Sequence, residues 1–69
     1  MQNTQTRLEV FEELMTREIG RTGYYGPEPL KSRELRGARA MWTMRLRKKH
    51  GYSLVEITAA WNRAVEAAR

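Results

Sequence analysis

The sequence contains no cysteine, and it has one histidine, two prolines and one phenylalanine among its 69 residues. Without cysteine it can form neither a disulfide framework nor a thiolate metal site, so we expect a reducing, cytoplasmic compartment. No apolar run approaches the roughly 20 residues that a membrane-spanning helix needs, and we expect no membrane association. The polar start at residues 1–6 is not typical of a signal peptide.

Groups that usually carry enzyme chemistry are also scarce. His50, the only histidine, follows Lys48 and Lys49 at the end of an expected helix. There it is better suited to capping carbonyls or contacting phosphate than to acid–base catalysis. The sequence has no glycine-rich phosphate loop, no nucleophile–base pair and no cluster of metal ligands. We therefore expect a protein that is not an enzyme, with no catalytic residues, no metal and no cofactor.

Positive charge is what the sequence does have, and it is concentrated in residues 31–50. That segment contains a single acid, Glu34, and eight basic residues: Lys31, Arg33, Arg36, Arg39, Arg45, Arg47, Lys48 and Lys49. The other residues carry five basic side chains and seven acids, so the formal net charge of +5 arises from this segment. A local basic patch on a small domain indicates a polyanionic partner, most often nucleic acid. A solvated face that keeps the domain soluble is the plainer alternative.

The spacing of apolar residues predicts an all-α fold in which residues 1–69 form one small domain of three helices. The first helix is expected over residues 6–19, with Gly20 as its C-cap. Its apolar face contains Leu8, Phe11, Leu14 or Met15, and Ile19. A loop with glycine and proline follows, and we expect its Tyr24–Tyr25 pair to pack over the core, with stacking against bases as the alternative.

The second helix is expected over residues 32–50 and the third over residues 53–68. Gly51 would end the second helix, and Ser53 with Glu56 has the spacing of a capping box that begins the third. The turn between them is short, which is typical of a helix-turn-helix unit. The apolar face of the second helix contains Leu35, Ala38, Trp42 and Leu46, and that of the third contains Leu54, Ile57, Trp61, Ala64, Val65 and Ala68.

Part of the sequence resembles a known pattern. The stretch reads Lys31-Ser32-Arg33, then Arg39-Ala40-Met41 and Leu46, then Ser53-Leu54-Val55-Glu56-Ile57 and Trp61. It is similar to the C-terminal DNA-binding domain of the bacterial replication initiator DnaA, whose architecture is shared with the Trp repressor superfamily. That family has Ser-x-Arg or Arg-Ser-Arg, an Arg-Gln-x-Ala-Met-x-Leu helix, and Ser-Leu-x-Glu-Ile followed by an aromatic residue. The correspondence runs without a gap over residues 31–61, under half of the chain.

The resemblance implies a helix-turn-helix fold and binding to double-stranded DNA. It implies that Arg33 reaches the minor groove from the start of the long helix, and that Arg39 occupies the place of the family's arginine before Ala-Met. The family continues with Gly-Arg-Asp-His-Thr-Thr-Val, which begins the helix that reads bases. Residues 62–69 read Asn-Arg-Ala-Val-Glu-Ala-Ala-Arg instead, so the recognition-helix motif is absent there.

These observations predict a small non-enzymatic DNA-binding protein or regulator that sets a basic helix against the phosphate backbone. The expected DNA contacts are Arg33, Arg36, Arg39, Arg45, Arg47, Lys48 and Lys49. Apart from Arg33 and Arg39, they are chosen on charge alone. Because phosphate contacts do not specify sequence, we expect a homodimer that presents two copies of a helix.

The alternative is a protein-interaction module, an adaptor or an inhibitor of a regulator, on a helix-turn-helix-like scaffold without DNA readout. The apolar surface of the predicted helices exceeds what a chain of this length easily buries. We therefore expect a partner or dimer interface that contains Met41, Met44, Trp61 and Val65.

Overall fold

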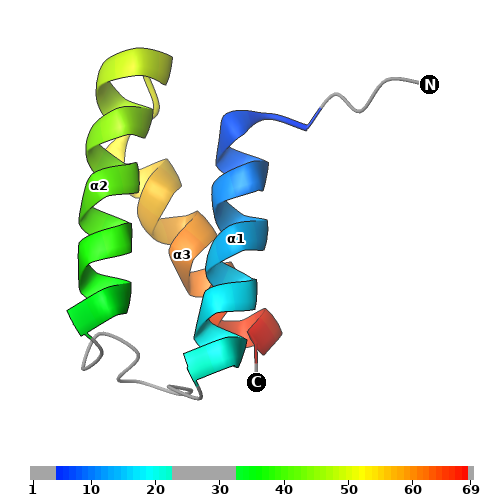
Figure 1. The fold of residues 1–69 in the computed structure, drawn as a ribbon. Coiled ribbons are helices and arrows are strands. Elements are labelled where there is room, and N and C mark those ends of the chain that lie inside the picture. The colour runs from blue at the N-terminus through cyan, green and yellow to red at the C-terminus, as the bar shows by residue number, and fades with distance from the viewer. Residues whose placement is uncertain (1–4, 23–32, 69) are drawn as a thin grey trace.

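A computed structural model describes residues 5–22 and 33–68 (Figure 1). These residues form three helices and no strand: α1 (Arg7–Thr22), α2 (Arg33–His50) and α3 (Leu54–Ala68). The prediction of an all-α fold is confirmed for this part of the chain. The expected glycine- and proline-containing loop, with Tyr24 and Tyr25, lies outside the described residues, as does Ser32 at the expected start of the second helix. Over the residues described, none of the helices has the length and apolar character that crossing a bilayer requires.

The core forms where α1 packs along α3, and α2 covers it from one side (Figure 1). α1 supplies the large side chains on the face that its periodicity predicts, while α3 contributes Ala60 and Ala64, whose short side chains permit close approach of the two helices. The buried core residues are Phe11, Met15, Ile19, Leu35, Leu46, Ile57, Ala60, Trp61, Ala64 and Val65. The packing of α1 against α3 therefore provides most of the buried apolar surface.

α1 and α3 both begin with a capping box. The N–H of Glu56 donates to Ser53 Oγ at 3.1 Å, and the N–H of Ser53 donates to Glu56 Oε1 at 2.9 Å. Thr6 and Glu9 form the same reciprocal pair at the start of α1, at 3.1 and 2.8 Å. The pKa of both glutamates lies below the ordinary value. The larger cause is the hydrogen bond from a backbone N–H to each carboxylate, and the smaller is the hydrogen bond with the hydroxyl, since both favour the ionised form. The capping box of α3 was predicted from the sequence, and that of α1 has the same spacing of three residues between the hydroxyl residue and the glutamate.

The two glycines that the sequence places at helix ends behave differently. Gly51 adopts a φ of 71° and ends α2, and the next N–H, that of Tyr52, donates to the carbonyl of Leu46 at 3.1 Å. Gly20 lies inside α1, which continues to Thr22, so the prediction that it caps the first helix is wrong. Arg21 supports this additional turn.

Arg21 stabilises the end of α1 through two carboxylates. Its Nη2 lies 2.7 Å from Glu18 Oε2 in the same helix and 3.1 Å from Glu34 Oε1 in α2. The pair of Arg21 with Glu34 joins α1 to α2. The residues next to Gly20 in the sequence therefore do not predict this contact at the end of α1.

α2 is the least buried of the helices. Only Leu35 and Leu46 of its 18 residues are buried, and Ala38 and Trp42 are partly buried against the core. The predicted inner face is thus confirmed. The rest of the circumference of α2 faces solvent, and the helix stands at one edge of the described fold (Figure 1).

Candidate nucleic-acid interface

All seven cations that the sequence nominates as DNA contacts lie on α2. Each is exposed except Arg39, which is partly buried. Since the buried stripe of α2 is narrow, the helical repeat spreads these cations around most of its solvent-facing side. Six of them form two groups on the two sides of the helix, and Arg33 is the first residue of α2.

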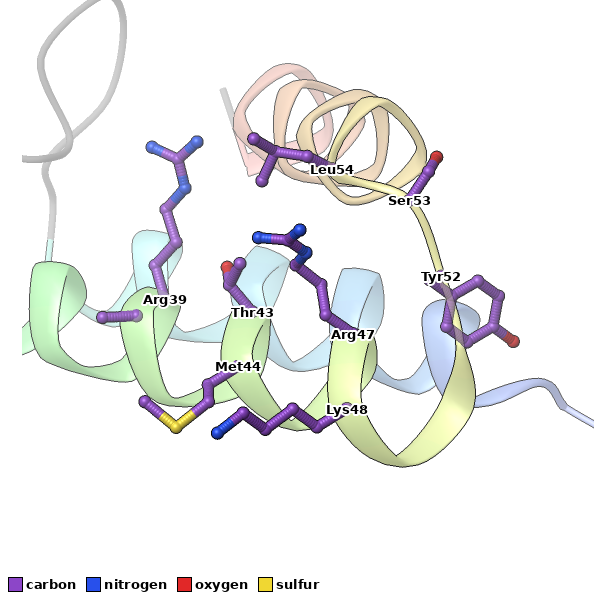
Figure 2. A pocket seen from close by; sticks show the side chains of 9 residues that line it. Arg39, Thr43, Met44, Arg47, Lys48, Tyr52, Ser53 and Leu54 are labelled. Carbon is purple, nitrogen blue, oxygen red and sulfur yellow. The ribbon is translucent and has the colours of Figure 1, made fainter.

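The first group faces a groove between α2 and α3, which we call the α2–α3 groove (Figure 2). Its lining residues are Arg39, Ala40, Thr43, Met44, Arg47, Lys48, Tyr52, Ser53 and Leu54. In Figure 2 the side chains of Arg39 and Arg47 reach from α2 toward α3, while Met44 and Lys48 lie lower on α2. Arg36 falls on the same flank as Arg39 and Arg47 by the helical repeat.

The second group lies on the other flank of α2, beside the start of α1. There Arg45, Lys49 and His50 line a shallow pocket with Trp42 and with Arg7 from α1. The guanidinium carbon of Arg45 lies 5.6 Å from the centroid of the Trp42 ring. The sequence did not nominate Arg7, because only the packing of α1 on α2 brings the start of one helix beside the end of the other.

The ion pairs of the described residues do not involve the cations of α2. Within residues 5–22 and 33–68, no carboxylate pairs with any of the seven. The ion pairs of this region are Arg17 with Glu13, Arg21 with Glu18 and Glu34, and Arg63 with Glu12. Arg17, Arg21 and Arg63 of α1 and α3 are therefore paired with carboxylates, whereas the positive charge of α2, with that of Arg7 beside it, is left to attract an anionic partner.

Four apolar residues were expected at a partner interface, and the fold separates them into two pairs. Met41 and Met44 are exposed, with 54% and 59% of their surface accessible. Trp61 and Val65 lie instead in the core, because the apolar stripe of α3 faces α1. With 4% and 9% of their surface accessible, Trp61 and Val65 offer a partner little area.

Two exposed apolar residues were not nominated from the sequence. Leu54 was placed on the inner face of the third helix, but it is 53% exposed and projects into the α2–α3 groove (Figure 2). Its neighbour Val55 is 78% exposed. Both belong to the first turn of α3, and the buried residues of that helix begin only at Ile57.

α2 carries a second apolar stripe on its solvent-facing side, which we call the outer stripe. It consists of Gly37, Ala40, Met41 and Met44, all exposed and spaced at i, i+3, i+4 and i+7. A Cβ atom built on Gly37 would meet nothing within 4 Å. Packing within the chain therefore does not require glycine at this position.

The chain matches no protein-family model, and no curated protein or solved structure matches it at a significant level. The resemblance of residues 31–61 to the DnaA C-terminal domain consequently rests on the motif alone.

Proposed function

We propose that this chain is a small DNA-binding protein that sets α2 against the phosphate backbone of double-stranded DNA. The observation that supports this most is that six of the seven α2 cations are exposed and that none of the seven pairs with a carboxylate in residues 5–22 and 33–68. A protein that neutralises phosphates releases condensed counterions, and this release drives binding without sequence information. Such contacts would use the exposed cations Arg33, Arg36, Arg45, Arg47, Lys48 and Lys49, and Arg39 is the nominated cation that is partly buried.

We also propose that α2, the turn at Gly51 and α3 form a helix-turn-helix-like scaffold, as the motif resemblance implies. In that interpretation α3 takes the place of the helix that precedes the base-reading helix. α3 runs without a break past Asn62 to Ala68, so the described residues contain no counterpart of the base-reading helix. DNA contacts would therefore fall to α2.

The test is fluorescence anisotropy of a labelled duplex of random sequence, titrated at low and at high salt. We expect the logarithm of the association constant to fall linearly with the logarithm of salt concentration, with a slope of about 0.9 for each neutralised phosphate. Light scattering on the same samples gives the mass of the complex and tests the proposed homodimer. Absence of binding at low salt would contradict the proposal.

A second function is favoured by the exposure of Met41, Met44, Leu54 and Val55. Exposed apolar residues mark many protein interfaces, and Met44 and Leu54 line the same groove, so the chain could serve as an adaptor or as an inhibitor of a regulator. Its partner would have to be acidic, because cations flank the outer stripe. This becomes the better proposal if no duplex binds at low salt.

A further inference from the structure

We infer that α2 lies in the major groove of duplex DNA, with its outer stripe toward the base edges and its flanking cations on the phosphates of both strands. This inference rests on the proposed DNA-binding function. Beyond phosphate binding, it specifies which groove α2 occupies, which residues contact the bases and which group on the bases they contact. In the family that residues 31–61 resemble, another helix has that role, so the inference comes from the surface of α2 itself.

Five cations of α2 lie to the two sides of the outer stripe, whereas Lys48, four residues after Met44, and Arg33, four residues before Gly37, continue the stripe at its two ends. At about 100° per residue, Arg47 falls about 60° to one side of Met44, and Arg45 falls about 100° to the other. The first side faces the α2–α3 groove, where Arg39 also lies, and the second faces the start of α1 beside Lys49. A helix that only touched one phosphate strand would need cations on one side alone.

The dimensions of α2 agree with those of the major groove. With its 18 residues it is about 27 Å long, and a helix with side chains is about 10–12 Å across. The major groove of B-DNA is about 12 Å wide and admits a helix, whereas the minor groove, at about 6 Å, does not. A helix in the major groove has a phosphate strand along each side, which matches the two rows of cations.

The residues of the outer stripe suit contact with base edges. Gly37 and Ala40 have little or no side chain, so the backbone of α2 could approach the groove floor closely at these positions. Met41 and Met44 are exposed, flexible and apolar, and the apolar group in the major groove is the C5-methyl of thymine. The stripe would therefore favour sites that contain thymine.

Two other occupants of the outer stripe fit the charges less well. If a second copy of α2 packed on this stripe, its cations would lie close to those of the first copy. Repulsion between these like charges would oppose association. An uncharged or basic protein segment would leave both rows of cations without partners. Duplex DNA offers negative charge on both sides of an apolar feature.

The experiment compares four labelled probes at one salt concentration. They are a thymine-containing DNA duplex, the same duplex with uracil for thymine, the corresponding RNA duplex and poly-glutamate of equal charge. We expect the thymine duplex to bind tightest, with a loss of about fourfold per contacted methyl group in the uracil duplex. The RNA duplex should bind at least about tenfold more weakly, because its major groove is too deep and narrow to be read by side chains.

The variant is Met41→Ala with Met44→Ala, and its control is Leu54→Ala with Val55→Ala, which also removes two exposed apolar side chains. We expect the methionine variant to bind the thymine duplex as weakly as the uracil duplex, while the control keeps the wild-type preference. Circular dichroism melts would show that both variants are folded.

Three results would overturn the inference. Equal affinity for the DNA and RNA duplexes, or an unchanged thymine preference in the methionine variant, would contradict the major-groove placement but leave phosphate binding intact. Poly-glutamate that binds as tightly as DNA would assign the stripe to an acidic protein. Absence of binding to every duplex would instead reject the proposed function itself.

Discussion

The guanidinium carbon of Arg39 lies 4.9 Å from the centroid of the Trp61 ring, so a cation of the basic helix rests on a core residue of α3. α2 and α3 have few other contacts with each other. Arg39 therefore joins the two helices through a cation–π contact, and it differs in this from the exposed cations of the same helix. The motif resemblance nominates Arg39 for DNA, but its position gives it a role in stability.

The first prediction separates that role from DNA binding. Arg39→Ala should lower the free energy of unfolding by about 0.5–2 kcal/mol, since it removes a partly desolvated cation–π contact. Arg36→Ala, an exposed change in the same helix, should alter it by less than about 0.5 kcal/mol. Urea denaturation followed by circular dichroism measures both. Equal effects of the two substitutions would show that the Arg39–Trp61 contact contributes nothing.

The second prediction concerns the charge of α2. Arg36→Gln with Arg47→Gln should reduce the salt slope of DNA binding by about two, because each arginine would neutralise one phosphate. The matched control is Arg17→Gln with Arg63→Gln, which removes the same charge from arginines already paired with Glu13 and Glu12. The slope of the control should stay at the wild-type value. A similar loss in both variants would mean that only net charge matters.

The third prediction addresses Trp61, which is 4% exposed. Trp61→Ala should cost about 3–5 kcal/mol, because it leaves a cavity in the core and removes the platform under Arg39. A domain this small has little stability to lose, so we expect the variant to be largely unfolded at room temperature. The control is Val55→Ala at the exposed start of α3, which should melt like the wild type. A folded Trp61→Ala protein would contradict the placement of Trp61 in the core.

Much of the fold follows from local patterns. The apolar periodicities predict the inner faces of α1 and α2, and the capping box and Gly51 locate the turn before α3 to within a residue. Those features could be predicted because their causes are local: backbone hydrogen bonds, positive φ and the helical repeat. The sequence places Met41 and Met44 off the inner stripe of α2 but left open whether other helices would cover them, and the fold leaves both exposed.

Other features depend on how the helices cross, which periodicity does not determine. The contact of Arg39 with Trp61 joins α2 to α3, and Arg7 meets Arg45 at a shared pocket only because α1 lies beside α2. The burial of Val65, expected at the surface, has the same origin in the packing of α3 on α1. The cations of the candidate interface could be nominated from sequence and placed around α2 by the helical repeat, but which neighbouring helix lies beside each side could not be predicted.

The fourth prediction contrasts two glycines. Gly20→Ala should stabilise the protein by about 0.5–1 kcal/mol, because Gly20 is helical and a Cβ there would meet nothing within 4 Å. Gly51→Ala should destabilise it by about 1–2 kcal/mol, since a φ of 71° is strained for a residue with a Cβ. Opposite shifts of the urea midpoint would confirm both assignments. Destabilisation by Gly20→Ala would restore Gly20 as a helix end.

The last prediction follows from the capping boxes and concerns acid. In the folded protein Glu9 and Glu56 have a pKa below the ordinary value of 4.5, because backbone N–H groups and hydroxyls bond to the ionised carboxylates. The unfolded chain therefore binds protons more readily, and acid shifts the equilibrium toward it. The two carboxylates make their full contribution to the free energy of unfolding above a pH of about 4.5. That contribution is lost as the pH falls through their lowered pKa values.

Urea midpoints measured from about pH 6 to about pH 3 test this sign. The wild type should lose stability steadily over the lower half of the range. Glu9→Gln with Glu56→Gln should be less stable than the wild type at pH 6, because the capping carboxylates are gone, yet should lose less on acidification. The two curves should therefore approach each other as the pH falls. Parallel curves would mean that the carboxylates of the capping boxes have ordinary pKa values and that other acids cause the acid sensitivity.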